Sequence, residues 1–205
     1  MGMATSPTSG STGGYLSSGS FGSGAATGFN GQINVSTSGT VRVSGTTYSV
    51  INSEADFVGM ASGGNYVIGS HLGFSTTYTA AVVASFTGKL DAFGHVISGL
   101  DINNSGANWV GLFSTSNGST VRNLGVSGSI VAASGVGTIA GNGFGGMAIS
   151  RTYSTVTVAT ANGSLVGGFV GLAGGVSISE SYVTGDVSGG DTVGGMVGFL
   201  YPGTI

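Results

Sequence analysis

The C-terminal half of the chain repeats itself at a nearly constant spacing, and this periodicity restricts the fold more than any other feature. The clearest column of equivalent residues is spaced by 28, 29 and 27 positions and consists of Val121, Ile149, Ile178 and Ile205. A second apolar column consists of Ile130, Val158 and Val187. A fixed period with short β-branched stretches is typical of a solenoid, in which each unit buries its apolar face only by stacking on the next.

Glycine forms the third column of the repeat. It contains the segments Val136-Gly137-Thr138-Ile139, Val166-Gly167-Gly168-Phe169-Val170-Gly171 and Val193-Gly194-Gly195-Met196-Val197-Gly198. A solenoid turns corners between its faces, and glycine permits both the positive φ and the close backbone approach that corners need. Columns that stay in register require equivalent strands stacked in parallel, about 4.8 Å apart. The repeat therefore predicts an all-β fold, a parallel β-solenoid with about 28 residues per coil.

Composition indicates a folded chain with little surface charge. Of 205 residues, 43 are glycine and only 11 are charged, whereas 40% are hydrophobic and the mean hydropathy is +0.40. Disorder requires low hydrophobicity and high charge, so we expect this chain to fold. Ser, Thr and Asn must then keep the surface soluble, and such surfaces suit extracellular, often surface-anchored proteins.

The charged residues argue against nucleic-acid binding. The net charge is −3, and the four basic residues, Arg42, Lys89, Arg122 and Arg151, are scattered along the sequence, whereas binding to phosphates needs a clustered basic face. The absence of cysteine excludes disulfides, thiol catalysis and cysteine-ligated metal sites. We expect no membrane-spanning helix, because no apolar run reaches the length of roughly 18 residues that such a helix needs. The N-terminus lacks signal-peptide features, which indicates a removed leader or a piece of a longer protein.

Three segments are expected along the chain. Residues 1–28 form a Ser/Gly/Thr-rich N-terminal segment of flexible composition. Residues 29–85 form the N-terminal β part of the solenoid, and residues 86–205 contain the repeats.

Local patterns within the second segment predict its elements. Apolar residues alternate between positions 33 and 51, which predicts short strands. Ser53 as N-cap, with Asp56 three residues later, predicts a short helix near 53–61, ended by the glycines that follow. An irregular stretch is expected over 70–85.

One unit of the repeat joins a glycine-rich segment to an aromatic one. It runs from Val166-Gly167-Gly168-Phe169-Val170-Gly171 to Ile178-Ser179-Glu180-Ser181-Tyr182-Val183-Thr184-Gly185-Asp186-Val187. Over its whole length this unit resembles the GLUG repeat of bacterial surface proteins. The preceding unit keeps Tyr153 but has Val156 where that family usually has glycine.

Upstream segments resemble filamentous-haemagglutinin-like adhesins. The matching segments are Gly64-Asn65-Tyr66-Val67-Ile68-Gly69, Phe86-Thr87-Gly88-Lys89-Leu90-Asp91 and Gly94-His95-Val96-Ile97-Ser98-Gly99-Leu100. Between the last two, Ala92 and Phe93 replace the usual Gly-Asn turn. The resemblance covers about residues 40–205 and implies a right-handed parallel β-helix in a secreted or surface-displayed bacterial protein, mostly large adhesins.

Asp91 and His95 are the most site-like polar pair in the sequence. They suggest an acid–base pair or half of a metal site. The alternative is a structural turn, in which Asp91 accepts hydrogen bonds from nearby backbone amides. We favour the turn, because the segment matches a lead-in that is itself structural in the family it resembles.

Asp186 and Asp191 suggest a carboxylate pair for glycoside cleavage or a calcium site. Calcium needs six to eight oxygen ligands. One coil earlier, the equivalent positions hold Thr157 and Asn162. Solvated loop charges are therefore the favoured interpretation.

Aromatic residues and asparagines complete the candidates. Tyr153 and Tyr182 lie one coil apart and are predicted to form a packing ladder rather than a glycan platform. Trp109 is predicted to occupy the core or a corner rather than to stack on a ligand. The pattern N-x-[ST] occurs at Asn34, Asn103, Asn117 and Asn162, where chance in an Asn/Ser-rich chain is the favoured explanation.

The sequence thus predicts a non-catalytic structural or adhesive β-helix of a secreted or surface-displayed bacterial adhesin. No catalytic, cofactor-binding or metal-binding residue is expected, and the expected partner is a protein or glycan on a host or neighbouring cell. A self-assembling extracellular filament subunit, stacked head to tail, is the main alternative, and a carbohydrate-active β-helix is a weaker one. As an interior residue, Ile178 is predicted to lose about 2–5 kcal/mol of unfolding free energy on replacement by alanine.

Overall fold

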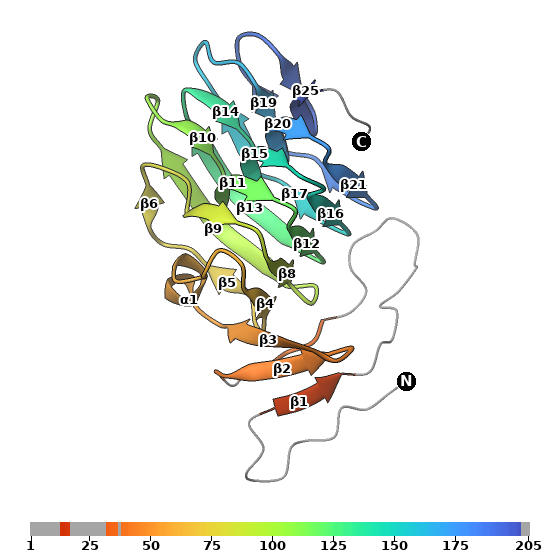
Figure 1. Cartoon of the computed structure of the whole chain (residues 1–205). Coiled ribbons are helices and arrows are strands. Elements are labelled where there is room, and N and C mark those ends of the chain that lie inside the picture. The colour runs from red at the N-terminus through yellow and green to blue at the C-terminus, as the bar shows by residue number, and fades with distance from the viewer. Residues whose placement is uncertain (1–12, 17–31, 37, 202–205) are drawn as a thin grey trace.

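The computed structural model describes residues 13–16, 32–36 and 38–201, and it forms a parallel β-solenoid of about five turns with coils of about 28 residues (Figure 1). The strands of successive coils form four sheets that run along the solenoid, which we name A to D. The predicted fold class, including the single short helix, is confirmed.

Sheets A and C run the length of the coil stack with parallel neighbours. Within the coils, sheet A contains β3 (Thr46–Ile51), β4 (Asn65–Ile68), β8 (Lys89–Asp91), β12 (Thr120–Arg122), β16 (Ala148–Ser150) and β21 (Ser177–Ser179). Sheet C contains β7 (Val83–Phe86), β11 (Phe113–Asn117), β15 (Ala140–Phe144), β20 (Val170–Gly174) and β25 (Val197–Tyr201).

Sheets B and D form the remaining faces, and sheet D begins one coil later than sheet B. Sheet B contains β5 (Leu72–Gly73), β6 (Thr77–Tyr78), β9 (Val96–Asn103), β13 (Gly125–Val131), β17 (Tyr153–Ser154), β18 (Thr157–Ala159), β22 (Tyr182–Val183) and β23 (Val187–Ser188). Sheet D contains β10 (Asn108–Val110), β14 (Ser134–Val136), β19 (Val166–Gly167) and β24 (Val193–Gly194).

The two predicted apolar columns stack in register. In sheet A, Val121 pairs with Ile149 and Ile149 with Ile178. In sheet B, Ile130 pairs with Val158 and Val158 with Val187. All but the last member of each column are buried, whereas Ile178 and Val187 are only half-buried. Both residues still pack against the main core, so the predicted columns form, and these two members are less covered because no further described coil lies over them. Ile205 lies outside the described residues.

The glycine column works through close backbone approach. A Cβ on Gly111 would overlap the Gly137 carbonyl one coil on, and a Cβ on Gly168 would overlap the Gly195 carbonyl. Neither residue has a positive φ. The sequence analysis gave two reasons for corner glycines, a positive φ and close backbone approach. At Gly111 and Gly168, close approach between adjacent coils is the one that applies.

Residues 70–85 form ordered coil structure, so the prediction of an irregular stretch is wrong. Strands β5 and β6 both pair in parallel with β9, and β7 pairs with β11. The return to the sheet near Val82 is confirmed. Sequence period alone missed this coil because its strands are only two residues long on sheet B.

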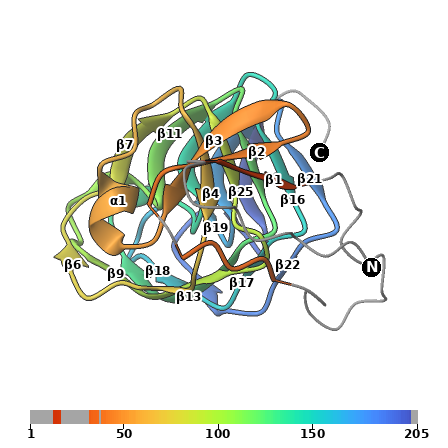
Figure 2. The same ribbon diagram turned by 90° about the horizontal axis from the view of Figure 1, so that it is seen from below.

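The N-terminal end of the coil stack is covered by helix α1 (Glu54–Val58) and a hairpin (Figure 2). Ser53 is the N-cap, as predicted, and its side chain accepts a hydrogen bond from Asp56 N at 3.1 Å. The helix is shorter than the predicted 53–61 because Gly59 already caps it. Phe57 points into the core, fully buried, with ring centroids 5.5 Å from Phe74 and 6.1 Å from Phe113.

The hairpin consists of β2 (Thr40–Val43), antiparallel to β3, and β1 (Gly13–Leu16) pairs in parallel with β2. Residues 32–36, which we call the strap, were predicted to include a strand but form none. Ile33 and Val35 of the strap pack instead against a second apolar cluster, separate from the main core. This outer cluster consists of Val41, Tyr48, Val50, Val67 and Phe93.

The opposite end of the stack, the C-terminal coil (residues 177–201), leaves apolar side chains uncovered. Its exposed large apolar residues are Tyr182, Val193, Met196, Phe199, Leu200 and Tyr201. No helix in the described part of the chain is long and apolar enough to cross a membrane.

Candidate functional site

A row of polar side chains follows the corner where the chain leaves sheet A. It takes one residue from each of four successive coils: Asp91, Asn123, Arg151 and Glu180. Asn123 donates from Nδ2 to Asp91 Oδ1 at 2.7 Å, and Arg151 donates from Nε to Asn123 Oδ1 at 2.8 Å. Glu180 ends the row, with Oε2 3.5 Å from an Arg151 guanidinium nitrogen. We call this row the corner ladder.

Backbone conformation places the corner ladder. Asn123, Arg151 and Glu180 directly follow strands β12, β16 and β21, and their φ angles are +56°, +47° and +49°. A left-handed residue turns the chain out of the sheet at the same point in each of these coils. Asparagine tolerates this conformation, whereas arginine and glutamate adopt it at a cost. The hydrogen bonds and the ion pair of the ladder offset part of that cost.

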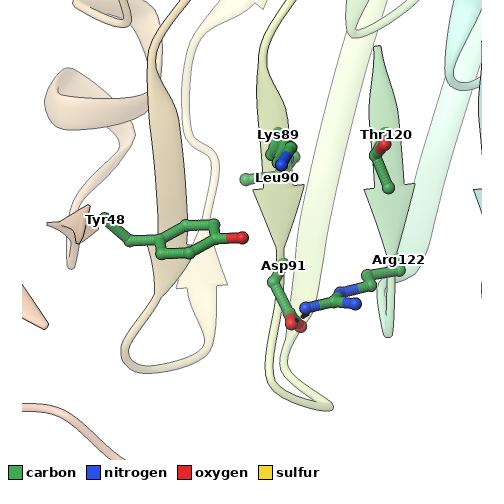
Figure 3. Close-up of a pocket in the computed structure, with 6 residues that line it drawn as sticks. All are labelled: Tyr48, Lys89, Leu90, Asp91, Thr120 and Arg122. Atoms are coloured by element: carbon green, nitrogen blue, oxygen red, sulfur yellow. Dashed lines mark hydrogen bonds and ion pairs between the residues drawn. The ribbon is translucent and has the colours of Figure 1, made fainter. Parts of the chain in front are cut away.

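Beside the corner ladder, the outward face of sheet A contains a hollow of about 170 Å³ (Figure 3). Its lining residues are Tyr48, Lys89, Leu90, Asp91, Thr120 and Arg122. Strand register brings them together, because Thr120 pairs with Lys89, and Arg122 with Asp91, across β8 and β12. The hollow is smaller than the roughly 300–1,000 Å³ of ordinary small-molecule pockets, so it admits one small group.

The carboxylate in the hollow is fully engaged. Asp91 is 4% exposed, and its Oδ2 accepts from Arg122 Nε at 2.7 Å. Its Oδ1 accepts from Asn123 and from Phe93 N. The side-chain ammonium of Lys89, by contrast, has no hydrogen-bond or ion-pair partner among the described residues. Two cations thus face one carboxylate, and the hollow is net positive.

Tyr48 supplies a neutral hydroxyl to the hollow. Burial raises its pKa, the Arg122 guanidinium lowers it and the Asp91 carboxylate raises it, with a net increase. The phenol therefore stays protonated over the physiological range. With the Lys89 ammonium and the Thr120 hydroxyl, it offers hydrogen-bond donors suited to a small anionic or hydroxyl-rich group (Figure 3).

Asp91 and His95 do not form a pair. Asp91 accepts from the amide of Phe93 at 3.1 Å, which is the predicted turn. The His95 ring lies 2.9 Å, through Nε2, from the carbonyl oxygen of Ile33 in the strap. No hydrogen bond joins the two side chains within the described residues, and the structural interpretation of Asp91 is confirmed.

Asp186 and Asp191 both lie on the C-terminal coil, and both are exposed. Neither side chain has a hydrogen-bond or salt-bridge partner in the described ranges. Over those same ranges, no group of three or more His, Cys, Asp or Glu side chains lies close enough to hold a metal ion.

Tyr153 and Tyr182 form the predicted packing ladder. Their ring centroids lie 5.5 Å apart and the rings are 8° from parallel. One coil earlier Gly125 stands in line, and a Cβ there would overlap the Tyr153 ring. Gly125 therefore leaves the space that the Tyr153 ring occupies at the start of the ladder.

Trp109 occupies a corner, one of the two predicted locations. Its φ is +59°, and Leu165 and Thr192 have positive φ at the equivalent corner of later coils. The indole is 37% exposed, so it does not belong to the core. A Cβ on Gly135 would overlap the indole ring, so glycine at this position lets the next coil pack directly against Trp109.

The four asparagines of the N-x-[ST] patterns, Asn34, Asn103, Asn117 and Asn162, are all exposed. Exposure is what modification of an N-x-[ST] acceptor requires.

Sequence reasoning did not single out the hollow. Arg122 appeared only as a scattered basic residue, Lys89 as a scattered basic residue and as part of a family-like segment, and Tyr48 only as part of a strand pattern. The sequence does place polar residues at alternate positions of both strands, as Lys89-x-Asp91 and Thr120-x-Arg122, and these strands are equivalent in successive coils. Predicting the hollow would have required the register between β8 and β12, and the spacing between these two strands differs from that between equivalent strands of the later coils.

Comparisons with family models, curated proteins and solved structures find no significant match for this chain. The similarity to GLUG repeats and to filamentous-haemagglutinin-like adhesins accordingly rests on the short motifs of the sequence.

Proposed function

We propose that this chain is a non-catalytic structural and adhesive β-solenoid of a secreted or surface-displayed bacterial adhesin. The observation that supports the proposal most is the unbroken parallel stack of sheet A, from β3 to β21. Such a stack presents length and outward-facing surface, and its rigidity comes from backbone ladders that connect every coil to the next.

In this proposal the outward faces contact a protein or glycan on a host or neighbouring cell. The hollow on sheet A is a contact point of suitable chemistry, because the Lys89 side chain is an unpaired cation among the described residues and Tyr48 and Thr120 carry hydroxyls beside it. Asp91 is occupied by Arg122, so it serves to fix the guanidinium rather than to act as an acid or base.

Cell binding by the purified chain tests the proposal. Fluorescently labelled protein is applied to cells before and after protease or glycosidase treatment. We expect saturable binding that one of the treatments abolishes, and a several-fold loss of affinity for Lys89→Gln combined with Tyr48→Phe. Arg42→Gln is the matched control, because Arg42 lies outside the hollow and its side chain donates only to Gly45 O in the described structure.

Two results would contradict the proposal. One is the absence of binding to every surface tried. The other is release of new reducing ends from polysaccharides incubated with the protein, which would establish catalysis.

A self-assembling filament subunit is the second candidate function. It is supported by the exposed apolar side chains of the C-terminal coil and by its strand edges, which are unpaired in the described structure. Such edges can pair with strands of another chain. Against simple head-to-tail stacking, helix α1 and the hairpin cover the N-terminal end of the described structure (Figure 2). Electron microscopy decides between them: we expect dispersed particles, whereas regular filaments with an axial repeat near one chain length would favour the filament.

A further inference from the structure

The strap crosses the ends of three strands of sheet A and is held there by side chains as well as backbone. Ile33 N donates to Phe93 O at 3.2 Å, after β8, and Val35 N donates to Gly69 O at 2.8 Å, after β4. Asn52, after β3, donates from Nδ2 to Val35 O at 3.0 Å. The strap thereby covers the outer apolar cluster.

His95 supplies the titratable contact of this strap. Its side chain is fully buried, and Nε2 lies 2.9 Å from Ile33 O. A carbonyl only accepts, so Nε2 carries the proton and Nδ1 is the bare lone pair of a neutral ring. Nδ1 is the one buried side-chain nitrogen or oxygen without a hydrogen-bond partner in the described part of the chain.

The groups that face this ring offer no counter-charge. His71, from the segment after β4, lies edge-on with its ring centroid 5.1 Å away, and its Nδ1 accepts from Val96 N at 3.0 Å. Gln32 of the strap lies 3.1 Å from His71 Nε2 and donates to Gly94 O. Asp91, the nearest acid along the chain, is held by Arg122 and Asn123.

We propose that the strap is a pH-operated latch, closed over the outer apolar cluster when His95 is neutral and released when His95 is protonated. A proton on Nδ1 would create a second N–H, now charged, where no acceptor is available. Burying an unpaired charged donor is strongly unfavourable, so the protonated ring must leave its site. Ile33 O then loses its donor, and Ile33 and Val35 lift from the cluster.

The direction of the pH effect follows from burial. Desolvation lowers the pKa of His95, the contact with Ile33 O raises it and nearby His71 lowers it, with a net decrease. With the latch released, the ring regains an ordinary pKa of about 6.5. Closure is therefore favoured above about pH 6.5 and weakens as the pH falls below it.

Amide hydrogen exchange across the strap tests the latch in the full chain. Opening constants for Ile33 N and Val35 N are measured at pH 7.5 and 5.0, after correction for the intrinsic exchange rate. We expect opening to increase by up to about 30-fold in the wild type, the limit set by the 1.5 pH units below an ordinary histidine pKa. His95→Gln keeps a donor for Ile33 O but does not titrate, and its opening should not depend on pH.

His71→Asn is the matched control, because an amide oxygen still accepts from Val96 N while the second imidazole beside His95 is removed. It should keep the wild-type pH response. The latch is wrong if wild-type opening is the same at both pH values, if His95→Gln retains the response, or if His71→Asn abolishes it.

NMR of the histidine rings in the wild type covers the case in which His95→Gln fails to fold. We expect His95 to be the Nε2–H tautomer at pH 7.5 and to become protonated in step with strap opening. A proton on Nδ1 at pH 7.5, or titration without strap opening, would overturn the proposal.

Discussion

The two ends of the described coil stack differ in how much apolar surface they leave exposed. At the N-terminal end, helix α1 places Phe57 over the first coil, and the Phe57 side chain is fully buried. The β2–β3 hairpin extends sheet A there with an antiparallel pair. At the C-terminal coil, residues equivalent to buried ones in earlier coils are uncovered. Leu200, for example, is 37% exposed, whereas its partner Ala173 is fully buried.

This difference shows what a repeat can and cannot specify. Each coil carries an apolar interior that only neighbouring coils cover, so the repeat alone leaves an open face at each end of the stack. Closing such a face needs a sequence outside the repeat. Residues 52–60 are such a sequence: an N-cap serine, a single helical turn and one large aromatic residue.

The largest effect is expected at the covered end. Phe57→Ala should lower the unfolding free energy by about 3–5 kcal/mol, because it removes an aromatic ring packed between Phe74 and Phe113. Val58→Ala is the control, since Val58 is 46% exposed on the same helix, and it should stay within about 0.5 kcal/mol. Denaturant melts measure both. Similar losses for the two variants would mean that α1 does not close the core.

The interior column gives the next comparison. Ile149→Ala should cost about 2–5 kcal/mol, because coils on both sides hold the cavity open. Ile178→Ala should cost about half as much or less, since Ile178 is half-buried. This revises the larger loss that the repeat alone predicted for Ile178. Equal losses in denaturant melts would show that the C-terminal coil is covered in solution.

Acid should weaken the cap before it weakens the coils. Burial raises the pKa of Glu54, but hydrogen bonds from Ser75, Tyr78 and Thr76 outweigh it and lower that pKa to about 2. The stabilisation is therefore complete above the ordinary glutamate pKa of about 4.3 and is lost as the pH falls toward 2. Glu54→Gln should reduce the loss of stability between pH 6 and pH 3, followed by denaturant midpoints. An unchanged pH profile would show that these bonds do not hold α1.

The smallest effect is expected for loop charges at the open end. Asp191 is exposed and unpaired within the described structure, so Asp191→Ala should change stability by no more than about 0.5 kcal/mol. A loss above about 1 kcal/mol in thermal or denaturant melts would reveal an interaction of this carboxylate that the coil geometry does not show.

Periodic features of this fold were readable from the sequence. The columns through Ile149 and Val158, the tyrosine ladder and the Ser53 N-cap all follow from spacing or local pattern, because stacked coils repeat the same environment at the same interval. The corner ladder escaped prediction because its residues share no type. Asn123, Arg151 and Glu180 occupy the same corner of successive coils, and Asp91 joins them from the strand before.

The strap and the hollow escaped prediction for a related reason. Both depend on contacts between segments with no repeat relationship, such as Ile33 with His95, or Tyr48 with the strand that carries Lys89. No local pattern encodes such contacts. They appear only when the coil register and the N-terminal hairpin are both in place.

The central claim is that the N-terminal end of the coil stack is covered and the C-terminal coil is not. Hydrogen exchange measured residue by residue along the chain tests it most directly. Protection should be highest in the central strands β12, β16 and β20, lower in the covered first coil, and lowest in β21 to β25, where one side of every sheet has no neighbouring strand in the described structure. Amides of β25 should exchange at least tenfold faster than those of β20. Equal protection of β25 and β20 in the monomer would contradict the account, because it would mean that the C-terminal coil is not an open end.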